Sequence, residues 1–475
     1  MRVRLCALGL AVLLGAAPAR AADAPALEAA LHGWLAALLG PGVALSDRPV
    51  QLVPQDNHWA MTVPVTGGIG DGLLLLGAPV TATLRAMDGG RWALDAIRLP
   101  PDLRLSAATP QGESVWTLTL RDQDAHAVID PALATTSSWD GRFGGYALHW
   151  QGPGGERQTE AVHVVSHLAW QPAAAGRIDV TATGRSELLT TNARMDRQGL
   201  VSFSAARTDA AGHIDALLPA RVPALIQAAL AAAPLLTPDA SRHMSPGLRG
   251  ALGAVLDVAG DLLAGFGEQV TMRDVHLHTR GMDLAMRMLA FGVNVSAPDG
   301  RIALKLHFAM DGLDGGAALP GGVGGDLVRH IALTPRLTGL PAGRVLALLH
   351  EALAHGGEDP ALPAEAAALM RDNPLAVGVD DFSLELGPAR FTAAGDMQVL
   401  GADQVSGQAR LRATGIDALI RDARDQPALG QVMPLLVFLK GLGEPDGDAT
   451  VWNIAYTGGH LTVNGTDLSQ MVPQK

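Results

Sequence analysis

Long stretches of alternating apolar and polar residues constrain the fold more than any other feature of this chain. Between Val43 and Arg207 the pattern has a period of two, as in Val115–Leu120 and Ile178–Thr183. Because successive side chains of a strand point to opposite faces of a sheet, this period predicts half-buried β-strands. Glycine-containing turns at 88–90, 152–155 and 174–176 are spaced as in long antiparallel hairpins.

The distribution of tryptophan predicts a change of domain. Of the 8 tryptophans, all but Trp452 precede residue 171, so the first half is expected to have a different core from the second. We place the boundary near residue 210. The sequence thus predicts a β-rich N-terminal domain over 22–210, with an amphipathic helix over 26–39, and a second domain over 211–475.

The second half alternates helical blocks with strands. Apolar residues recur at helical spacing in two blocks and predict an amphipathic helix in each. These residues are Leu248, Leu252, Val255, Leu256, Leu262, Leu263 and Phe266, and then Val345, Leu346, Leu348, Leu349 and Leu353. A polar helix over 416–425, an apolar helix over 428–442 and a closing hairpin over 451–465 follow.

Two segments of the second half resemble each other. The strand pattern of 270–278 recurs at 377–385, and that of 303–312 recurs less closely at 407–415. We interpret this as a weak duplication of a helical block followed by a three-stranded meander, with units at about 245–315 and 340–425. Chance similarity between amphipathic strands is the open alternative. The expected fold class is α+β, with long antiparallel meanders and amphipathic helices packed on one face.

The first 21 residues have the form of a secretory signal peptide. Arg2 and Arg4 precede an apolar run over 5–17, and small residues flank Arg20 at the expected cleavage site. The run is shorter than the roughly 20 residues that span a bilayer. We therefore expect export to the periplasm of a Gram-negative cell, with secretion as the second choice.

Composition excludes several functions. The single cysteine, Cys6, lies inside the signal segment, so thiol catalysis and thiolate metal sites are not expected in the mature chain. The formal net charge of −12 argues against a nucleic-acid partner. No run of residues predicts a transmembrane helix after the signal segment.

Three groups of acidic residues and histidines have spacings that could bind metal. Asp274, His276 and His278 alternate on one strand, with His307 on a strand expected nearby. The second group is Asp122, Asp124 and His126, and the third is His163 and His167. In each case the solvent face of an amphipathic strand explains the pattern better, so we predict no metal site and no cofactor.

The local signatures of the common exported serine hydrolases are missing. The chain has neither a Gly-x-Ser-x-Gly elbow nor a Ser-x-x-Lys motif. Dispersed catalytic residues leave no such signature. A cleft that joins a carboxylate of perturbed pKa to a histidine within hydrogen-bond reach would therefore overturn the expectation. We predict no catalytic residues and a protein that is not an enzyme.

Three sequence segments in the second half resemble a known group of proteins. They are residues 391–399, residues 405–415 and the hairpin that begins at 448–452. Over roughly 250–468 the chain resembles uncharacterised exported envelope proteins of alphaproteobacteria, AsmA-like or YdgA-like in texture. The resemblance implies a role in the cell envelope and an apolar groove beneath long sheets that shelters lipid. It carries no functional residue over, and this chain lacks the membrane anchor of the longer members.

Taken together, these patterns predict a binding or scaffold role in the cell envelope. Aliphatic helix faces with few polar residues are expected to shelter a lipid or another apolar ligand. The candidate ligand-binding residues are Leu252, Leu256, Leu263, Phe266, Leu435, Leu436 and Leu439. A packed core accounts for the same faces. The alternative function is a structural protein that binds a partner protein through sheet edges, without a small-molecule ligand; the oligomeric state stays open.

Overall fold

The computed structural model describes residue 28 and residues 50–469, apart from short segments within that range. The segments outside the described residues are 65–66, 70–72, 110–111, 131–134, 196–198, 233–243, 316–326, 356–360, 402–403 and 426–432. The predicted signal peptide therefore lies outside the described residues, as does the predicted helix over 26–39 except for the helical Glu28. The described chain is mostly β, with antiparallel strands and six helices.

The chain divides into two compact units. The first comprises residues 1–202, 207–266 and 350–358, and the second comprises residues 203–206, 267–349 and 359–475. Strands of the first unit are β1 (Gln51–Gln55), β2 (His58–Val63), β3 (Gly67–Ile69), β4 (Leu73–Gly77), β5 (Val80–Ala86), β6 (Trp92–Arg98), β7 (Asp102–Thr109), β8 (Gly112–Asp130), β9 (Thr135–Gly152), β10 (Gly155–Pro172), β11 (Ile178–Met195) and most of β12 (Gly199–Leu217). Its helices are α3 (Val222–Ala232) and α4 (Pro246–Leu262).

Long hairpins form the centre of the first unit. Strands β8 to β11 have 18 or 19 residues each, and each pairs antiparallel with the next. The turns between them fall where the glycines predicted them: Pro153–Gly154 joins β9 to β10, and a short 3₁₀ turn over Ala174–Gly176 joins β10 to β11. The predicted antiparallel meander is thus confirmed.

The sheet forks at β8. The first half of β8 pairs with β7, and its second half pairs with β6. Strands β5, β2 and β1 continue from β6, while β4 and β3 continue from β7. At the break lie Leu99, Pro100 and Pro101, and the prolines have no N–H to donate. The side-chain amide of Gln123 fills the gap: its Oε1 accepts from Leu99 N at 2.7 Å and its Nε2 donates to Leu99 O at 2.9 Å.

Mid-strand irregularities shift the alternation of buried residues. In β10 the buried residues Thr159 and Ala161 have odd numbers, whereas Leu168 and Trp170 have even numbers. Between them, His163 has a positive φ of 47° and the register with β11 shifts. A β-bulge of this kind lets one face stay buried although the sequence slips by one residue.

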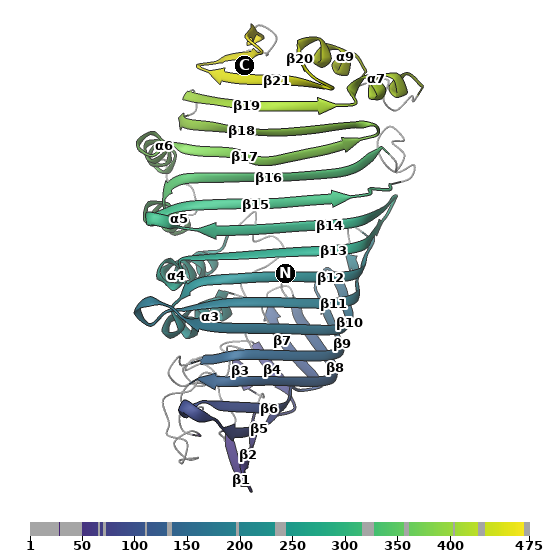
Figure 1. The fold of residues 1–475 in the computed structure, drawn as a ribbon. Coiled ribbons are helices and arrows are strands. Elements are labelled where there is room, and N and C mark those ends of the chain that lie inside the picture. Colours follow the sequence, from purple (N-terminus) through teal and green to yellow (C-terminus); the bar gives the residue numbers. More distant parts are fainter. Residues whose placement is uncertain are drawn as a thin grey trace. The chain divides into compact units, whose positions relative to one another are not determined.

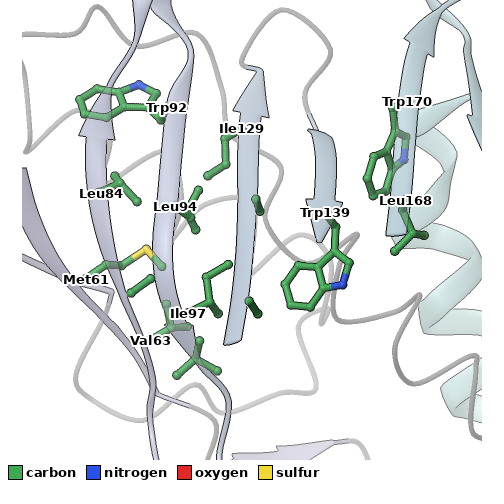
Figure 2. Packing of buried hydrophobic residues seen from close by; sticks show 14 of the residues in the cluster. Met61, Val63, Leu84, Trp92, Leu94, Ile97, Ile129, Trp139, Leu168 and Trp170 are labelled. Atoms are coloured by element: carbon green, nitrogen blue, oxygen red, sulfur yellow. The ribbon is translucent and has the colours of Figure 1, made fainter. Parts of the chain in front are cut away.

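The first unit buries an aromatic-rich core on one side of its sheet. Figure 2 shows Trp92, Trp139 and Trp170 in this cluster, among aliphatic side chains from successive strands. The ring of Trp92 packs edge-on against Trp59 at a centroid distance of 5.2 Å. Val222 and Leu225 of α3 and Leu262 at the end of α4 pack against the same cluster. Four of the seven tryptophans of the first half thus share one core.

The second unit contains a second antiparallel meander (Figure 1). Its strands are most of β13 (Gly265–Thr279), β14 (Met282–Ser296), β15 (Arg301–Asp311), β16 (Val328–Pro341), β17 (Leu375–Leu386), β18 (Ala389–Gly401), β19 (Gln404–Thr414), β20 (Glu444–Asp446), β21 (Ala449–Thr457), β22 (His460–Val463) and β23 (Thr466–Asp467). The helices are α5 (Ala342–His355), which is divided between the units, α6 (Leu362–Asp372), α7 (Ile416–Asp425) and α9 (Met433–Leu442).

Strands β14 to β19 pair in sequence order, and β21 pairs with β19. Short strands complete this end: β20 and β22 pair with β21, and β23 pairs with β22. Helices α7 and α9 pack on the sheet through Ile416, Leu419 and Leu436, which join clusters with Phe391 and Trp452. The predicted α+β class with long antiparallel meanders and packed helices is confirmed.

Some predicted boundaries differ from the structure. Helix α4 ends at Leu262, and Phe266 belongs to β13, not to the helix. The first predicted meander has a fourth strand, β16, before α5. Each of the two similar segments, 270–278 and 377–385, has a backbone irregularity near its middle. Asp274 in β13 has a positive φ of 50°, and β17 shifts register between Val379 and Phe382.

Candidate functional site: an apolar sheet face

One face of the β14–β17 sheet is built almost entirely from large apolar side chains. The register places Phe291 opposite Phe308, Phe308 opposite Leu333, and Leu333 opposite Phe382. Because opposite residues project to the same side of a sheet, these four form one row across four strands. We call the surface the apolar face. Its members on β14 to β17 are Leu289, Phe291, Val293, Val295, Leu304, Leu306, Phe308, Met310, Ile331, Leu333, Leu337, Val377, Val379, Phe382 and Leu384.

The opposite face of the same strands, here called the polar face, carries charged side chains around a small buried cluster of Ala290, Ala309 and Ala332. Asn294 lies opposite Lys305, and Lys305 lies opposite Arg336. Further along, Asp311 lies opposite His330, which in turn lies opposite Glu385. A sheet with one apolar and one polar face normally buries the apolar one. The exposure of the apolar face therefore decides what this unit can bind.

A bulge in β17 keeps the two faces separate. Asp380 and Asp381 together oppose one residue of β18, so Val379 and Phe382 both stay on the apolar face. Asp380 Oδ2 lies 2.7 Å from Lys305 Nζ, and its Oδ1 lies 2.6 Å from Arg336 Nε. The hydrogen bond from Lys305, followed by the charges of Lys305 and Arg336, lowers the pKa of the Asp380 carboxyl.

Among the described helices, α7 and α9 cover one end of this sheet side. At its β18–β21 end, Phe391, Leu411 and Trp452 pack with residues of α7 and α9, and Trp452 Nε1 donates a hydrogen bond to Leu439 O at 2.7 Å. At the β14–β15 end, Phe291, Leu306 and Phe308 retain 45%, 42% and 39% of their surface. We call these three adjacent side chains the aromatic patch.

The predicted ligand-binding residues lie in both units. In the first unit, Leu263 packs against the core cluster, Leu252 and Leu256 are half-buried on α4, and Phe266 is partly exposed at the start of β13. Each is thus placed by its own helix or strand, and the structure gives no shared site for them.

In the second unit, Leu436 of α9 packs into the clusters beside the sheet, and Leu439 is half-buried. The side chain of Leu435 lies outside the described residues. The exposed apolar residues of α9 are instead Val437 and Phe438.

Histidines of the three predicted groups contact carboxylates in the structure. His126 contacts Asp124 and Asp95, His163 contacts Glu187, and the other pairs are His167 with Asp140 and His278 with Asp283. In the described part of the chain, no three acidic, histidine or cysteine side chains are arranged to hold a metal ion. The positive φ of Asp274 also interrupts the alternation on which the first predicted group depends.

Three residues on the polar face form a serine–histidine–aspartate relay. His330 Nδ1 lies 2.5 Å from Asp311 Oδ1, and its Nε2 lies 2.8 Å from Ser383 Oγ. This order of contacts can transfer a proton from the hydroxyl to the imidazole. Acyl transfer also requires donors for an oxyanion. The backbone at Ser383 is paired with Ala332 on one side and Thr392 on the other. The backbone N–H groups there are therefore engaged in the sheet and do not point at an oxyanion.

Sequence reasoning missed the aromatic patch. The turn over Pro298–Gly300 could have predicted the patch, because a tight turn fixes which residues of the flanking strands lie opposite each other. Reflecting β14 onto β15 about that turn pairs Phe291 with Phe308, as the structure shows. The relay had no comparable signal, because Asp311, His330 and Ser383 lie on three separate strands.

No family model matches the chain, and neither a curated protein nor a solved structure is significantly similar to it. None of the helices in the described ranges has the length and apolarity of a membrane-spanning helix. What the fold and the site define is therefore a class: an antiparallel β-protein with an accessible apolar sheet face.

Proposed function

We propose that this protein binds a lipid or another ligand with a long apolar chain in the periplasm, and that the apolar face of the second unit is the binding surface. The observation that carries the proposal is the aromatic patch. Phe291 and Phe308 lie directly opposite each other on adjacent strands, with Leu306 beside them, and all three are exposed. Contiguous exposed apolar side chains typically mark a ligand or partner surface.

The neighbouring strands support an extended ligand. Val293 lies opposite Leu306 and Leu304 lies opposite Leu337, so apolar residues continue along and across the strands from the patch. Each Å² of apolar surface removed from water contributes about 25 cal/mol. A flexible hydrocarbon chain can therefore gain affinity along the whole surface without any specific polar contact.

A binding role also accounts for the polar relay. The Ser383 side chain is buried, and its hydrogen bond to His330 satisfies it, as buried polar groups require. We accordingly propose a binding protein and not an enzyme. The relay then joins β15, β16 and β17 on the face opposite the ligand.

The neutral fluorescent probe N-phenyl-1-naphthylamine tests the proposal on the purified full-length protein. We expect probe binding to the wild type and about tenfold weaker binding to Phe308→Glu, because a charge replaces apolar contact area. The matched control is Val53→Glu, which changes an apolar residue of β1 in the first unit that is more exposed than Phe308, at 55% against 39%. Circular dichroism confirms that both variants fold.

Mass spectrometry of an organic extract provides a second measurement. A stoichiometric lipid in the protein purified from periplasm supports the proposal. Absence of probe binding together with an empty extract contradicts it. The same result favours the alternative, a structural protein that binds a partner through sheet edges.

A further inference from the structure

Two arginines lie at one end of the apolar face. Arg287 precedes Leu289 by two residues on β14, and Arg329 precedes Ile331 by two residues on β16. Met288, Asp311 and His330 lie opposite one another in a regular register on the other side of the sheet, so their neighbours Arg287 and Arg329 fall on the side that carries the apolar residues. At Arg329 itself β16 shifts register against the next strand, β17. Both side chains are exposed.

The chain between them brings the two arginines into one neighbourhood. Gly312, just after β15, donates its N–H to Arg329 O at 2.8 Å. A side chain at Gly312 would overlap Arg287, since its Cβ would lie 2.9 Å from Arg287 Cγ. Arg287 therefore crosses over Gly312 toward the strand that carries Arg329. The absence of a side chain at Gly312 makes room for this path.

Among the described residues, no carboxylate lies at ion-pair distance from the guanidinium of Arg287 or Arg329. Cations of the polar face differ, because Lys305 and Arg336 both pair with Asp380. The contrast is informative in a chain of net charge −12. An arginine guanidinium presents planar donors that match a carboxylate or a phosphate.

We propose that Arg287 and Arg329 bind the anionic headgroup of a lipid whose hydrocarbon chain lies along the apolar face. The inference rests on the proposed function and specifies its ligand. From Arg287 to Val295 the strand advances eight residues, or about 26 Å at 3.3 Å per residue. The aromatic patch lies within this length, so a long acyl chain can reach it from a headgroup at the arginines.

A pair of probes with the same hydrocarbon chain tests the inference. Fluorescent cis-parinaric acid carries a carboxylate at about pH 8, well above the usual carboxyl pKa, and its methyl ester is neutral. We expect the wild-type full-length protein to bind the acid about three- to tenfold more tightly than the ester, as expected for two exposed charge contacts. High salt should reduce this preference by screening.

The double variant Arg287→Gln/Arg329→Gln should lose the preference for the acid while its affinity for the ester stays unchanged. The matched control, Arg121→Gln/Arg221→Gln, removes two exposed positive charges of the first unit and should keep the preference.

Equal binding of acid and ester by the wild type would overturn the headgroup site but leave the apolar-ligand function intact. Loss of the preference in the control variant would also overturn it, since net charge alone would then explain the effect. If neither probe binds, the proposed function fails and the headgroup site fails with it.

Discussion

The side chain of Asn464, which follows β22, contacts two other segments, the end of α9 and strand β21. Its Oδ1 accepts from Asn453 N at 2.8 Å and from Asn453 Nδ2 at 3.2 Å. Its Nδ2 donates to Leu442 O at 2.9 Å and to Val451 O at 3.0 Å. The residue has a positive φ of 47°, which asparagine tolerates better than most residues. One amide thus fixes the end of α9 and the β21–β22 hairpin together.

Replacing this amide with a carboxylate, in Asn464→Asp, should destabilise the second unit. The shape is preserved, but two carbonyl oxygens lose their donor and face a negative charge. An unsatisfied polar group costs about 1–3 kcal/mol. Because Asn464 is only half-buried, we expect a loss of about 2–4 kcal/mol in the free energy of unfolding at neutral pH.

Urea unfolding followed by circular dichroism measures the loss, and hydrogen exchange of β21 and β22 localises it. The neighbouring carbonyls favour the protonated form and so raise the pKa of the new carboxyl group above its unfolded value of about 3.9. The deficit should therefore be smallest below that value and grow as the pH rises through it. A variant as stable as the wild type, or a deficit independent of pH, would refute the role assigned to the amide.

Three further predictions concern other parts of the chain. Gly250→Ala should raise the free energy of unfolding, measured by thermal denaturation, by about 0.5–1 kcal/mol, because Gly250 lies in α4 with open space around its Cβ position. In contrast, Gly154→Ala should lower the free energy of unfolding, because Gly154 has a φ of +92° although the space around it is also open. The pKa of Asp380 is lowered in the folded state, so its contribution to stability is present above the ordinary pKa of 3.8 and is lost as the pH falls through the folded-state pKa. Asp380→Asn should therefore flatten the decrease of the melting temperature below about pH 4. Ser383 should show no labelling by a fluorophosphonate probe, and covalent labelling that Ser383→Ala abolishes would establish catalysis.

Much of the strand arrangement followed from alternation and turns alone. The segment Val115–Leu120 lies in β8, and Ile178–Thr183 lies in β11. The mid-strand bulges could not be predicted, because a one-residue shift in the alternation of apolar and polar residues cannot be told from ordinary irregularity of the sequence. Phe266 shows a related limit: its spacing from Leu262 and Leu263 fits a helix, but the chain is extended from Gly265 onward.

The candidate site was less accessible to sequence reasoning than the fold. Apolar residues of α9 were identified, yet spacing on one helix does not reveal which of them face the sheet; Leu436 does, whereas Phe438 is exposed. The aromatic patch depends on the register between two strands. The pairing of Arg287 with Arg329 depends on a third strand between them. Contacts of that range follow from assembly of the sheet, not from local periodicity.

The outermost strands bear on self-assembly. An unpaired strand edge is a template on which a second molecule can continue a sheet into a fibre. Here β3 has three residues, β23 has two, and β1 carries Pro54, which has no N–H to offer. These described ends present few backbone groups to an incoming chain. These ends therefore offer a poor template for growth of the sheet into a fibre.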